Sequence, residues 1–396
     1  MKPVLSLCAQ PLFEARGSPI RVKAFLRALG NDGISVDVIT LPVGPNVRLP
    51  RCIRLSRVLN LLLVKSVAIG PSVPKLIFGV LIALRGLLFA MTRRYSSVHG
   101  IEEMGLPAWI LARLSGARFV FEKHSDPDSH RSDSRVRNFV MSCYAAMERF
   151  VCRRADIVIA TGSGLAAQVA SYGTDAEIYV VSDVPTSDRE ACVDRIPHWR
   201  SRFGCQPGET VAAYIGSFAG YQAVPLFLEA VRVALPKNPL LRVVLVGGSK
   251  EDGEKVRTVG EESGCPERLV HFERIDQEEV PDFLQSCEIL VSPRMKGGNT
   301  PLKVLDYLRS GQCILAVDTD ANRLVVDEEV SLMVPPTVEG LADGMERLMN
   351  DQPLRERLGK AGRQRFESRF GFDRFRDELI KVFGRSSRDS RKKNDN

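Results

Sequence analysis

Short apolar runs alternate with longer segments of helical periodicity along the whole chain. Each run is bounded by glycine or polar turn residues, a pattern typical of strands that a parallel sheet buries on both faces. Because the pattern occurs twice, it predicts two doubly wound α/β domains. The strands predicted in the first half are Pro3–Leu7, Val36–Thr40, Ser97–His99, Arg118–Phe121, Ile157–Ala160 and Ile178–Val181. Those predicted in the second half are Val211–Gly216, Arg242–Gly247, Leu269–Phe272, Ile289–Val291, Cys313–Val317 and Leu332–Val334.

A break in the periodicity near residue 190 separates the two halves. Pro185, Pro197 and Pro207 interrupt every regular pattern there, so we place the domain boundary at this break. Ligands of doubly wound sheets bind at the carboxyl ends of the strands, and the expected site is therefore a cleft between two facing domains. The predicted parts are a first domain over residues 1–188, a second over 189–370, a C-terminal helix over 371–384 and a disordered basic tail over 385–396.

Basic residues concentrate in one region of the first domain. The chain of 396 residues has a formal net charge of +7, yet residues 38–101 hold nine Lys or Arg and no acidic residue. A basic region that is also apolar is typical of an element lying on an anionic membrane surface. We therefore expect membrane contact through residues 48–94. The nine cations are Arg48, Arg51, Arg54, Arg57, Lys65, Lys75, Arg85, Arg93 and Arg94.

Residues 73–92 are the most apolar part of this region. Their length approaches that of a membrane span, but Arg85 near the middle would cost about 2.5–3.5 kcal/mol there. Packing of this helix against its own sheet, with Arg85 reaching solvent, is the alternative to interfacial docking. Nucleic-acid binding fits less well, because few aromatic side chains stand between the cations.

The cysteine pattern indicates a reducing compartment. Nine cysteines are scattered along the chain with no CxxC pair, and several stand in apolar runs where a free thiol behaves as a small hydrophobe. This excludes a disulfide framework and the usual zinc motifs. The apolar run at the N-terminus is too short for a signal peptide and fits a first core strand. We therefore expect a cytosolic protein.

The segment Ser292–Gly311, SPRMKGGNTPLKVLDYLRSG, has the pattern of a strand end, a glycine-rich turn and a helix start. Thr300 is a good N-cap residue, and Pro301 suits the first helical position. Gly297 and Gly298 let the backbone come close to a ligand. Because a helix N-terminus presents free N–H groups and a positive dipole, this segment predicts a site for an anion such as a phosphate.

Three cations surround the predicted helix start: Arg294, Lys296 and Lys303. Asp306 follows Lys303 by three residues and therefore shares its helix face. The arrangement suits a nucleotide, with a phosphate at the helix start and a ribose hydroxyl one turn further on. An ordinary strand–loop–helix unit with a solvated basic rim is the alternative.

These residues give the chain a resemblance to GT-B glycosyltransferases of the family-4 type. A bacterial branch of that family reads SPR-x-x-G-x-NTPLK-x-x-x-YL-x-SG in its second domain, and residues 292–311 match this motif. Residues 15–20, ARGSPI, resemble the ARGTPI turn of the same branch. Weaker similar segments fall at residues 99–103, 214–218 and 354–370. The match covers nearly the whole chain and keeps its order.

The resemblance implies a GT-B fold and the retaining transfer of a sugar from a nucleotide diphosphate sugar, UDP- or GDP-linked. The donor would bind the second domain, and the acceptor, a glycan or a lipid-linked molecule, would bind the first. Such hexosyltransferases use no metal or other cofactor, because cationic side chains and a helix N-terminus stabilise the leaving diphosphate. Taken with the cysteine pattern and the basic apolar region, the resemblance leads us to expect a cytoplasmic enzyme, peripheral at the inner face of the cytoplasmic membrane, that serves cell-envelope polysaccharide biosynthesis.

This sequence departs from the family's pattern in both halves of the donor site. Related enzymes carry two Glu separated by seven residues, and Gly298 and Asp306 stand at those positions here. Asp306 keeps a carboxylate for the ribose, whereas backbone groups around Gly298 must serve the donor sugar. Relatives also place an Arg and a Lys where this chain has Ser217 and Gln222. The diphosphate would then depend on the cations of residues 292–311.

The first domain offers further candidates at its strand ends. His124 follows the predicted strand Arg118–Phe121 and resembles the family's histidine near the donor sugar; a structural histidine is the alternative. An imidazole titrates near neutrality and can donate to a sugar hydroxyl. Gly17, at the first strand-to-helix turn, opens the backbone to the diphosphate or acceptor, or else marks a tight turn with positive φ. Glu102 and Glu103 follow another predicted strand and face either the acceptor or solvent.

Arg274 completes the candidates, since it follows a predicted strand where relatives hold the base and it can stack on a nucleobase. The glycine at position 298 leaves a catalytically inactive GT-B binding or partner protein as the main alternative to a transferase. A nucleotide-sugar epimerase or hydrolase on the same fold is a further one. The predicted catalytic residues are His124, Arg294 and Lys303. The predicted substrate-binding residues are Gly17, Gly216, Arg274, Lys296, Gly297, Gly298, Asn299, Thr300 and Asp306.

Overall fold

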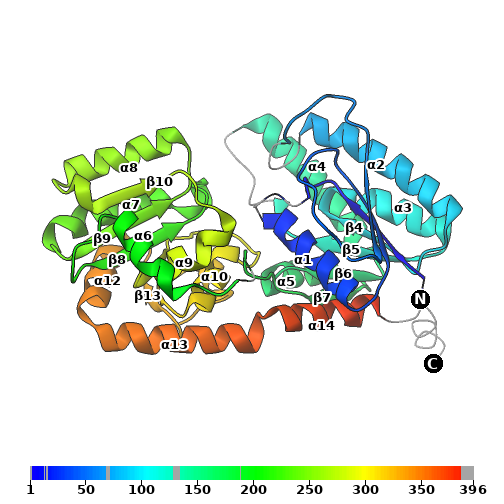
Figure 1. Ribbon diagram of the computed structural model, residues 1–396. Helices are drawn as coiled ribbons and strands as arrows, with labels where there is room; N and C mark the ends of the chain where they lie inside the picture. Colours follow the sequence, from blue (N-terminus) through cyan, green and yellow to red (C-terminus); the bar gives the residue numbers. More distant parts are fainter. Residues whose placement is uncertain are drawn as a thin grey trace. The chain divides into compact units, whose positions relative to one another are not determined.

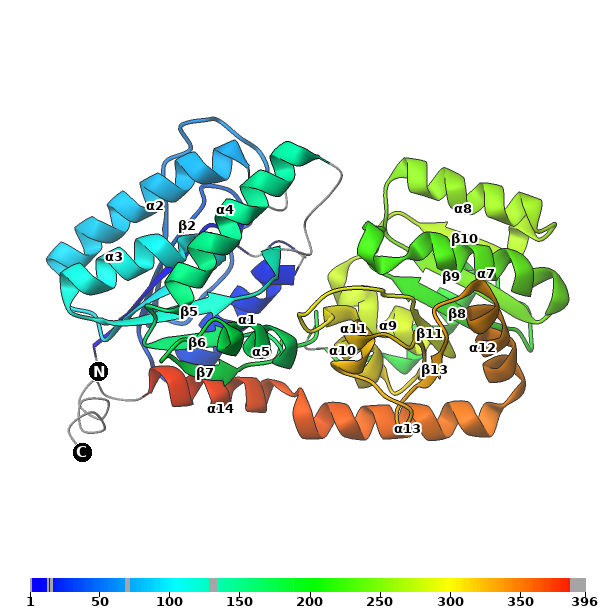
Figure 2. The same cartoon turned by 180° about the vertical axis from the view of Figure 1, so that it is seen from behind.

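A computed structural model describes residues 2–12, 14, 17–67, 72–127, 134–187 and 189–384. The chain divides into two compact units, and each is built on one parallel sheet. Figures 1 and 2 show helices on both faces of each sheet, so the prediction of two doubly wound α/β domains is confirmed. The predicted disordered tail lies outside the described residues. Unit 1 comprises Met1–Val184 and Phe372–Asn396, and unit 2 comprises Pro185–Gly371.

Unit 1 contains a seven-stranded parallel sheet. Its strands are β1 (Val4–Cys8), β2 (Val36–Thr40), β3 (Ile53–Arg57), β4 (Ser97–Ile101), β5 (Arg118–Lys123), β6 (Ile157–Ala160) and β7 (Glu177–Val180). They lie in the order β3-β2-β1-β4-β5-β6-β7, which reverses between β1 and β4. The apolar pattern predicts all of them except β3. This strand lies at the sheet edge with only Ile53 and Ser56 buried, so it has no continuous apolar run.

Helices cover both faces of this sheet. One face carries α2 (Val73–Thr92), α3 (Gly105–Ser115) and α4 (Arg135–Cys152). The other carries α1 (Gly17–Asn31) and α14 (Phe372–Phe383), and α5 (Ser163–Ser171) packs on β6 and β7. The C-terminal helix therefore returns to unit 1. There the ring of Phe383 lies 5.4 Å from that of Phe25 and 5.4 Å from that of His99.

Unit 2 contains a six-stranded parallel sheet. Its strands are β8 (Thr210–Ile215), β9 (Leu241–Val246), β10 (Leu269–Phe272), β11 (Ile289–Ser292), β12 (Cys313–Val317) and β13 (Leu332–Val334). All six correspond to predicted strands, because each is a short apolar run; β8, β9, β11 and β12 are buried almost throughout, whereas β10 and β13 at the two edges of the sheet are mostly half-buried. Their order, β10-β9-β8-β11-β12-β13, reverses between β8 and β11.

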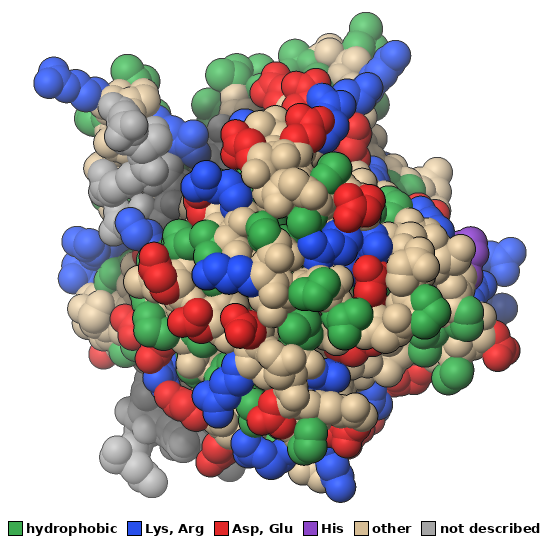
Figure 3. Space-filling view, turned by 90° about the vertical axis from the view of Figure 1, so that its left-hand side faces the viewer, with side chains coloured by type: hydrophobic (Ala, Val, Ile, Leu, Met, Phe, Trp, Pro, Cys, Tyr) green, Lys and Arg blue, Asp and Glu red, His purple; other side chains and the backbone are tan. Residues whose placement is uncertain are grey.

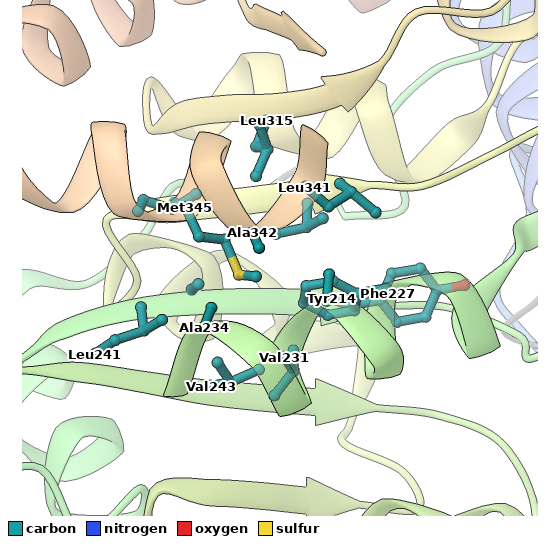
Figure 4. Close-up of a cluster of buried hydrophobic side chains, with 14 of the residues drawn as sticks. Tyr214, Phe227, Val231, Ala234, Leu241, Val243, Leu315, Leu341, Ala342 and Met345 are labelled. Atoms are coloured by element: carbon teal, nitrogen blue, oxygen red, sulfur yellow. The ribbon is translucent and has the colours of Figure 1, made fainter. Parts of the chain in front are cut away.

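The helices of unit 2 are α6 (Ile196–Arg202), α7 (Val224–Lys237), α8 (Lys250–Glu262), α9 (Val280–Gln285), α10 (Leu302–Ser310), α11 (Asp320–Arg323), α12 (Val338–Asn350) and α13 (Gln352–Arg369). One core lies under α7, α8 and α12, where Phe227 and Val231 of α7 gather with Leu341 and Met345 of α12 in one buried cluster (Figure 4). The other core, under α6, α9 and α10, is centred on Trp199. Two buried faces hold the sheet rigid, so its strand ends can position side chains accurately.

Candidate functional site

The sheet of unit 2 reverses its strand order between β8 and β11, and the loops that follow these two strands hold most of the predicted residues. Ligands of doubly wound sheets bind beyond the carboxyl ends of the strands at such a switch point. Gly216 follows β8 directly, and residues 293–301 connect β11 to α10. The topology therefore places Gly216 and the predicted residues of the 293–301 loop at the carboxyl ends of β8 and β11.

Lys303, in the first turn of α10, reaches across this switch point to β8. Its Nζ donates a hydrogen bond to the hydroxyl of Tyr214 over 2.8 Å. A Cβ on Gly216 would lie only 2.9 Å from the same Nζ, so the absence of a side chain there leaves the space that the lysine fills. Gly216 has a φ of +148°, which also favours glycine.

The charge of Lys303 has no counterion in the described part of the chain. The lysine forms no ion pair with any described residue, and the only charged neighbour that affects its pKa is another cation, Arg294. Burial, and then this cation, lower the pKa of Lys303 well below its ordinary value. Lys303 is partly buried, and an ammonium removed from water without a carboxylate partner is unfavourable until an anion joins it. These electrostatics are what an anion site requires.

The side chain of Arg294 stabilises the loop between β11 and α10 by hydrogen bonds. Its side chain is 3% exposed; Nε donates to the Lys296 carbonyl over 3.0 Å, and Nη2 donates to Oδ1 of Asn299 over 2.8 Å. A Cβ on Gly297 would clash with this guanidinium, so the glycine lets Arg294 fold beneath the loop. Burial lowers the pKa of Arg294. The arginine therefore shapes the loop, and its contact with phosphate oxygens stays a prediction.

The helix after this loop begins one residue later than predicted. Pro301, with φ −77° and ψ 104°, is the N-cap residue of α10, and no side chain caps the helix. The prediction that Thr300 is the N-cap and Pro301 the first helical residue is therefore wrong. The fixed φ of proline fits an extended conformation as well as a helix, and here Pro301 continues the extended loop. Thr300 is buried before the helix start.

Asp306 lies one turn beyond Lys303 but points to the segment that opens unit 2. Its Oδ1 accepts a hydrogen bond from the backbone N–H of Thr186 over 2.9 Å. Burial raises the pKa of Asp306 to about 7, against the lowering effect of that hydrogen bond. The carboxyl group also lines a small pocket together with Pro281 and Arg309. At neutral pH, Asp306 can thus either accept or donate a hydrogen bond to a hydroxyl group.

The remaining predicted residues of unit 2 are more open. Lys296 and Arg274 are exposed, and neither forms an ion pair with a described residue. Gly298 is half-buried beside Gly297. Gln222, which stands where relatives carry a cation, is buried, and its Oε1 has no hydrogen-bond partner among the described residues. The structure thus brings Lys303, Arg294 and Gly216 together and leaves Arg274 and Lys296 at the surface.

In unit 1, the predicted residues lie at the carboxyl ends of neighbouring strands around the β1–β4 switch point. His124 follows β5, and its Nδ1 contacts the hydroxyl of Ser18 at the start of α1. Gly17, the residue before Ser18, is the exposed first residue of α1. The alternative of a positive φ at Gly17 is wrong, since the residue is helical. A Cβ there would meet nothing within 4 Å, so the helix start is open at this point.

Glu122 is the centre of a buried charge cluster that includes His124. Its Oε1 lies 2.5 Å from Nε of Arg21 and 3.0 Å from Nε2 of His124, and its Oε2 lies 2.9 Å from Nε2 of His99. Arg21 also pairs with Asp183 over 2.9 Å. Burial alone would raise the pKa of Glu122, but Arg21 and His124 outweigh it and hold this pKa well below its ordinary value. Conversely, Glu122 overcomes the effect of burial and raises the pKa of His124.

Glu102 holds the loop that contains His124. Its Oε1 accepts hydrogen bonds from the backbone N–H of His124 over 2.9 Å and from Oγ of Ser125 over 3.0 Å. Its own φ is +50°, a conformation rare for a residue with a side chain and frequent near functional sites. Glu103 pairs instead with Lys75 over 3.3 Å. Contact of either glutamate with an acceptor stays a prediction.

Sequence reasoning missed Tyr214, Arg21 and Glu122. Tyr214 occurs in an apolar strand, where a tyrosine is usually a core residue. Glu122 precedes His124 by two residues in the chain, and an acidic residue inside a buried strand was the one signal available for it. His124 and Gly17 belong to unit 1, and Lys303 and Gly216 belong to unit 2; a shared cleft stays a prediction.

Comparison with known families decides the broad class of protein. Residues 16–182 match the model of the glycosyl transferase 4-like domain, and residues 196–365 match that of glycosyl transferases group 1. The chain therefore carries the two domains of a glycosyltransferase. In this glycosyltransferase, Lys303 and Arg294 lie in the second matched domain, and the cluster around Glu122 and His124 lies in the first.

Curated relatives of the glycosyltransferase are distant in sequence. The chain is 22% identical to O-antigen chain mannosyltransferase C of Escherichia coli over 279 residues, which cover 69% of this chain and 70% of that protein. It is 25% identical to the phosphatidyl-myo-inositol mannosyltransferase of Mycobacterium tuberculosis (strain ATCC 25618 / H37Rv) over 203 residues, which cover 49% of this chain and 50% of that protein.

Solved structures confirm the predicted GT-B fold. Sucrose-phosphate synthase from Thermosynechococcus elongatus superposes with a TM-score of 0.79 at 18% identity, covering 97% of this chain and 98% of that one. HepE of Anabaena, determined with UDP-glucose, gives a TM-score of 0.73 at 12% identity, covering 97% of this chain and 100% of that one. Within the described residues of the glycosyltransferase, no group of three or more His, Cys, Asp or Glu is placed to hold a metal ion.

Proposed function

We propose that this glycosyltransferase moves a hexose from a UDP- or GDP-linked sugar to a glycan or lipid-linked acceptor, with retention of configuration and without a metal ion. The single observation that supports this best is Lys303, a partly buried ammonium that forms no ion pair with any described residue and lies at the switch point of unit 2. Negative charge collects on the diphosphate as the glycosidic bond breaks. A preorganised cation aimed at that charge lowers the barrier.

The other residues have roles that follow from their positions. Free N–H groups in the first turn of α10 add to the field of Lys303. The buried carboxyl group of Asp306 suits a ribose hydroxyl, and exposed Arg274 suits the face of a base. Since Gly298 offers no carboxylate, the backbone of residues 297–299 would hold the donor sugar. In unit 1, Glu122 raises the pKa of His124 and so favours the protonated ring, which suits the role near the donor sugar that the resemblance implies.

Calorimetry with UDP, GDP, UDP-glucose and GDP-mannose tests this proposal on the full chain. We expect micromolar to millimolar binding of one diphosphate series, because a diphosphate supplies the missing counterion of Lys303. Release of the diphosphate in the presence of acceptor lipids or glycans then identifies transfer. Failure of every nucleotide to bind at millimolar concentration would rule out both transfer and a nucleotide-sugar epimerase.

A catalytically inactive GT-B binding protein is the second candidate, and the glycine at position 298 favours it. Such a protein would bind the nucleotide sugar through the same Lys303 but would not break the glycosidic bond. Turnover therefore separates the two candidates, since neither donor hydrolysis nor transfer would accompany binding. A hydrolase or epimerase on this fold would consume the donor without an acceptor.

We also propose that unit 1 docks on an anionic membrane surface through residues 48–94. In the described part of the chain, α2 is the one helix long and apolar enough to cross a membrane, and 28% of its most apolar stretch is buried. One side of α2, including Phe78 and Ile82, packs into the unit. The opposite side exposes a stripe with a spacing of four residues, which suits an element lying in the lipid interface. The stripe is Leu76, Val80, Leu84 and Leu88.

The charge of the neighbouring helices supports this surface. Together, α2, α3 and α4 contain six Lys or Arg but one acidic residue, Glu148, which is buried against Lys123. Exposed apolar side chains continue from α2 to Leu114 of α3 and Phe139 of α4. By contrast, acidic and basic side chains are interspersed on the face shown in Figure 3. An apolar and cationic layer fits an anionic bilayer.

Replacement of Leu84 and Leu88 by glutamate is expected to abolish membrane docking. Both side chains are exposed, so the double variant should fold, but it loses apolar burial in the interface and gains repulsion from anionic lipid. We expect partition into phosphatidylglycerol vesicles to fall at least about tenfold in flotation assays. Leu240→Glu, which changes an exposed leucine of unit 2, is the control. Equal flotation of the double variant and the wild type would contradict the proposed surface.

A further inference from the structure

We propose that Tyr214 is the positioning residue for Lys303, and that its neutral hydroxyl aims the ammonium at the diphosphate without cancelling its charge. The inference rests on the proposed function, since it assigns Lys303 to the diphosphate. The two residues are 89 positions apart and meet at the switch point, with 2.8 Å between Nζ and the hydroxyl oxygen. Before a diphosphate binds, the Tyr214 hydroxyl would give the Lys303 ammonium a hydrogen-bond acceptor that carries no negative charge.

The hydrogen bonds around the hydroxyl fix its orientation. The single proton of the Tyr214 hydroxyl is donated to the carbonyl of Ser217 over 2.6 Å. The oxygen can then only accept from Lys303, which uses one of the three Nζ protons. Two protons of the ammonium remain for an anion. The Ser217 carbonyl, Tyr214 and Lys303 thus form a chain of donors and acceptors that ends in the predicted phosphate position.

The ring of Tyr214 is itself immobile. The side chain is fully buried, with its ring 5.9 Å from that of Phe218 in an edge-on arrangement and 6.5 Å from that of Phe227 (Figure 4). Nζ of Lys303 lies 4.0 Å from the centroid of the tyrosine ring, so the ring face also attracts the cation. On the other side, the missing side chain of Gly216 gives the lysine its space. The lysine is therefore held between a fixed aromatic ring and a bare backbone.

A neutral partner has a physical advantage over a carboxylate at this place. A buried aspartate or glutamate would pair with Lys303, neutralise it and repel the diphosphate. A hydroxyl oxygen orients the same ammonium with a dipole alone. The full charge therefore stays available for the diphosphate, whose own charge grows as the donor bond breaks.

Tyr214→Phe tests the inference, because it keeps the ring and removes the hydroxyl. We expect the Kd for UDP to rise by about tenfold, which is typical for loss of a hydrogen bond to a charged group. The Kd for UDP-glucose should rise less, and kcat should fall, because the leaving diphosphate carries more charge than the intact donor. In a Lys303→Ala background, the same change should leave UDP affinity unaltered, since the tyrosine would act only through the lysine.

Tyr307→Phe is the matched control. Tyr307 is a buried tyrosine of α10 whose hydroxyl accepts from the backbone N–H of Ile215 over 3.1 Å. This control should lower the melting temperature without changing UDP affinity. An unchanged UDP affinity of Tyr214→Phe, or additive effects with Lys303→Ala, would overturn the positioning role alone. If Lys303→Ala itself binds UDP as well as the wild type does, the proposed function fails instead.

NMR of the wild-type chain keeps the inference testable if Tyr214→Phe does not fold. The Nζ signal of Lys303 can be assigned by its disappearance in Lys303→Ala. We expect its protons to exchange with water more slowly than those of exposed lysines such as Lys255, and to shift when UDP binds. Exchange as fast as that of the exposed lysines would overturn the hydrogen bond to Tyr214.

Discussion

Lys303→Ala is expected to abolish sugar transfer while the chain stays folded. The variant removes the partly buried cation that extends from the first turn of α10 to β8, so the charge growing on the diphosphate loses the cation that would balance it. Loss of one preorganised group of this kind typically lowers kcat by about 10²–10³-fold. Steady-state measurement of diphosphate release, together with UDP calorimetry, gives the effect on kcat and on binding.

The stability of this variant is an independent check. Burial and the neighbouring Arg294 both disfavour the charged form of Lys303, so its ammonium is not stabilising, and its removal should leave the urea midpoint unchanged or slightly higher. Lys255→Ala is the control, because Lys255 is an exposed lysine of α8 and should change neither rate nor stability by a measurable amount. A folded Lys303→Ala protein with the wild-type rate would remove Lys303 from the donor site.

Glu122→Gln is expected to destabilise unit 1 by about 3 kcal/mol, as is typical when one partner of a buried ion pair is lost. The change leaves Arg21 and His124 buried without the carboxylate that both contact. It should also lower the pKa of His124, since Glu122 is what raises it. Urea unfolding at pH 7 measures the first effect. Titration of the histidine signals by NMR measures the second, and the chain has only five histidines.

The pH dependence of this effect has a definite sign. The folded pKa of Glu122 is depressed, so its contribution to stability is present above the unfolded value of 4.5 and is lost as the pH falls through the folded value. The difference between wild type and Glu122→Gln should therefore shrink at strongly acidic pH. Asp377→Asn, in the exposed pair with Arg376 of the same unit, should leave the free energy of unfolding nearly unchanged. An equal cost for both variants would show that the cluster around Glu122 is not stabilising.

The sequence by itself determined the fold class of this protein and pointed to one segment as a candidate anion site. Strands such as Cys313–Val317 are continuous apolar runs, and their burial on both faces follows from composition alone. The segment Ser292–Gly311 concentrates glycines and cations within twenty residues, so its chemistry was visible without a structure. The edge strand β3 and the true start of α10 were not predicted, because neither depends on a strong local preference.

Only the tertiary structure decided which side chains meet. The hydroxyl of Tyr214 contacts Lys303 from 89 residues away, and Ser18 contacts His124 from 106 residues away. Sequence periodicity reports which side of a strand or helix is buried, but it contains no information on strand order, and strand order is what places these residues together. For the same reason, the return of α14 to unit 1, which puts Phe383 on His99, appeared only in the folded chain.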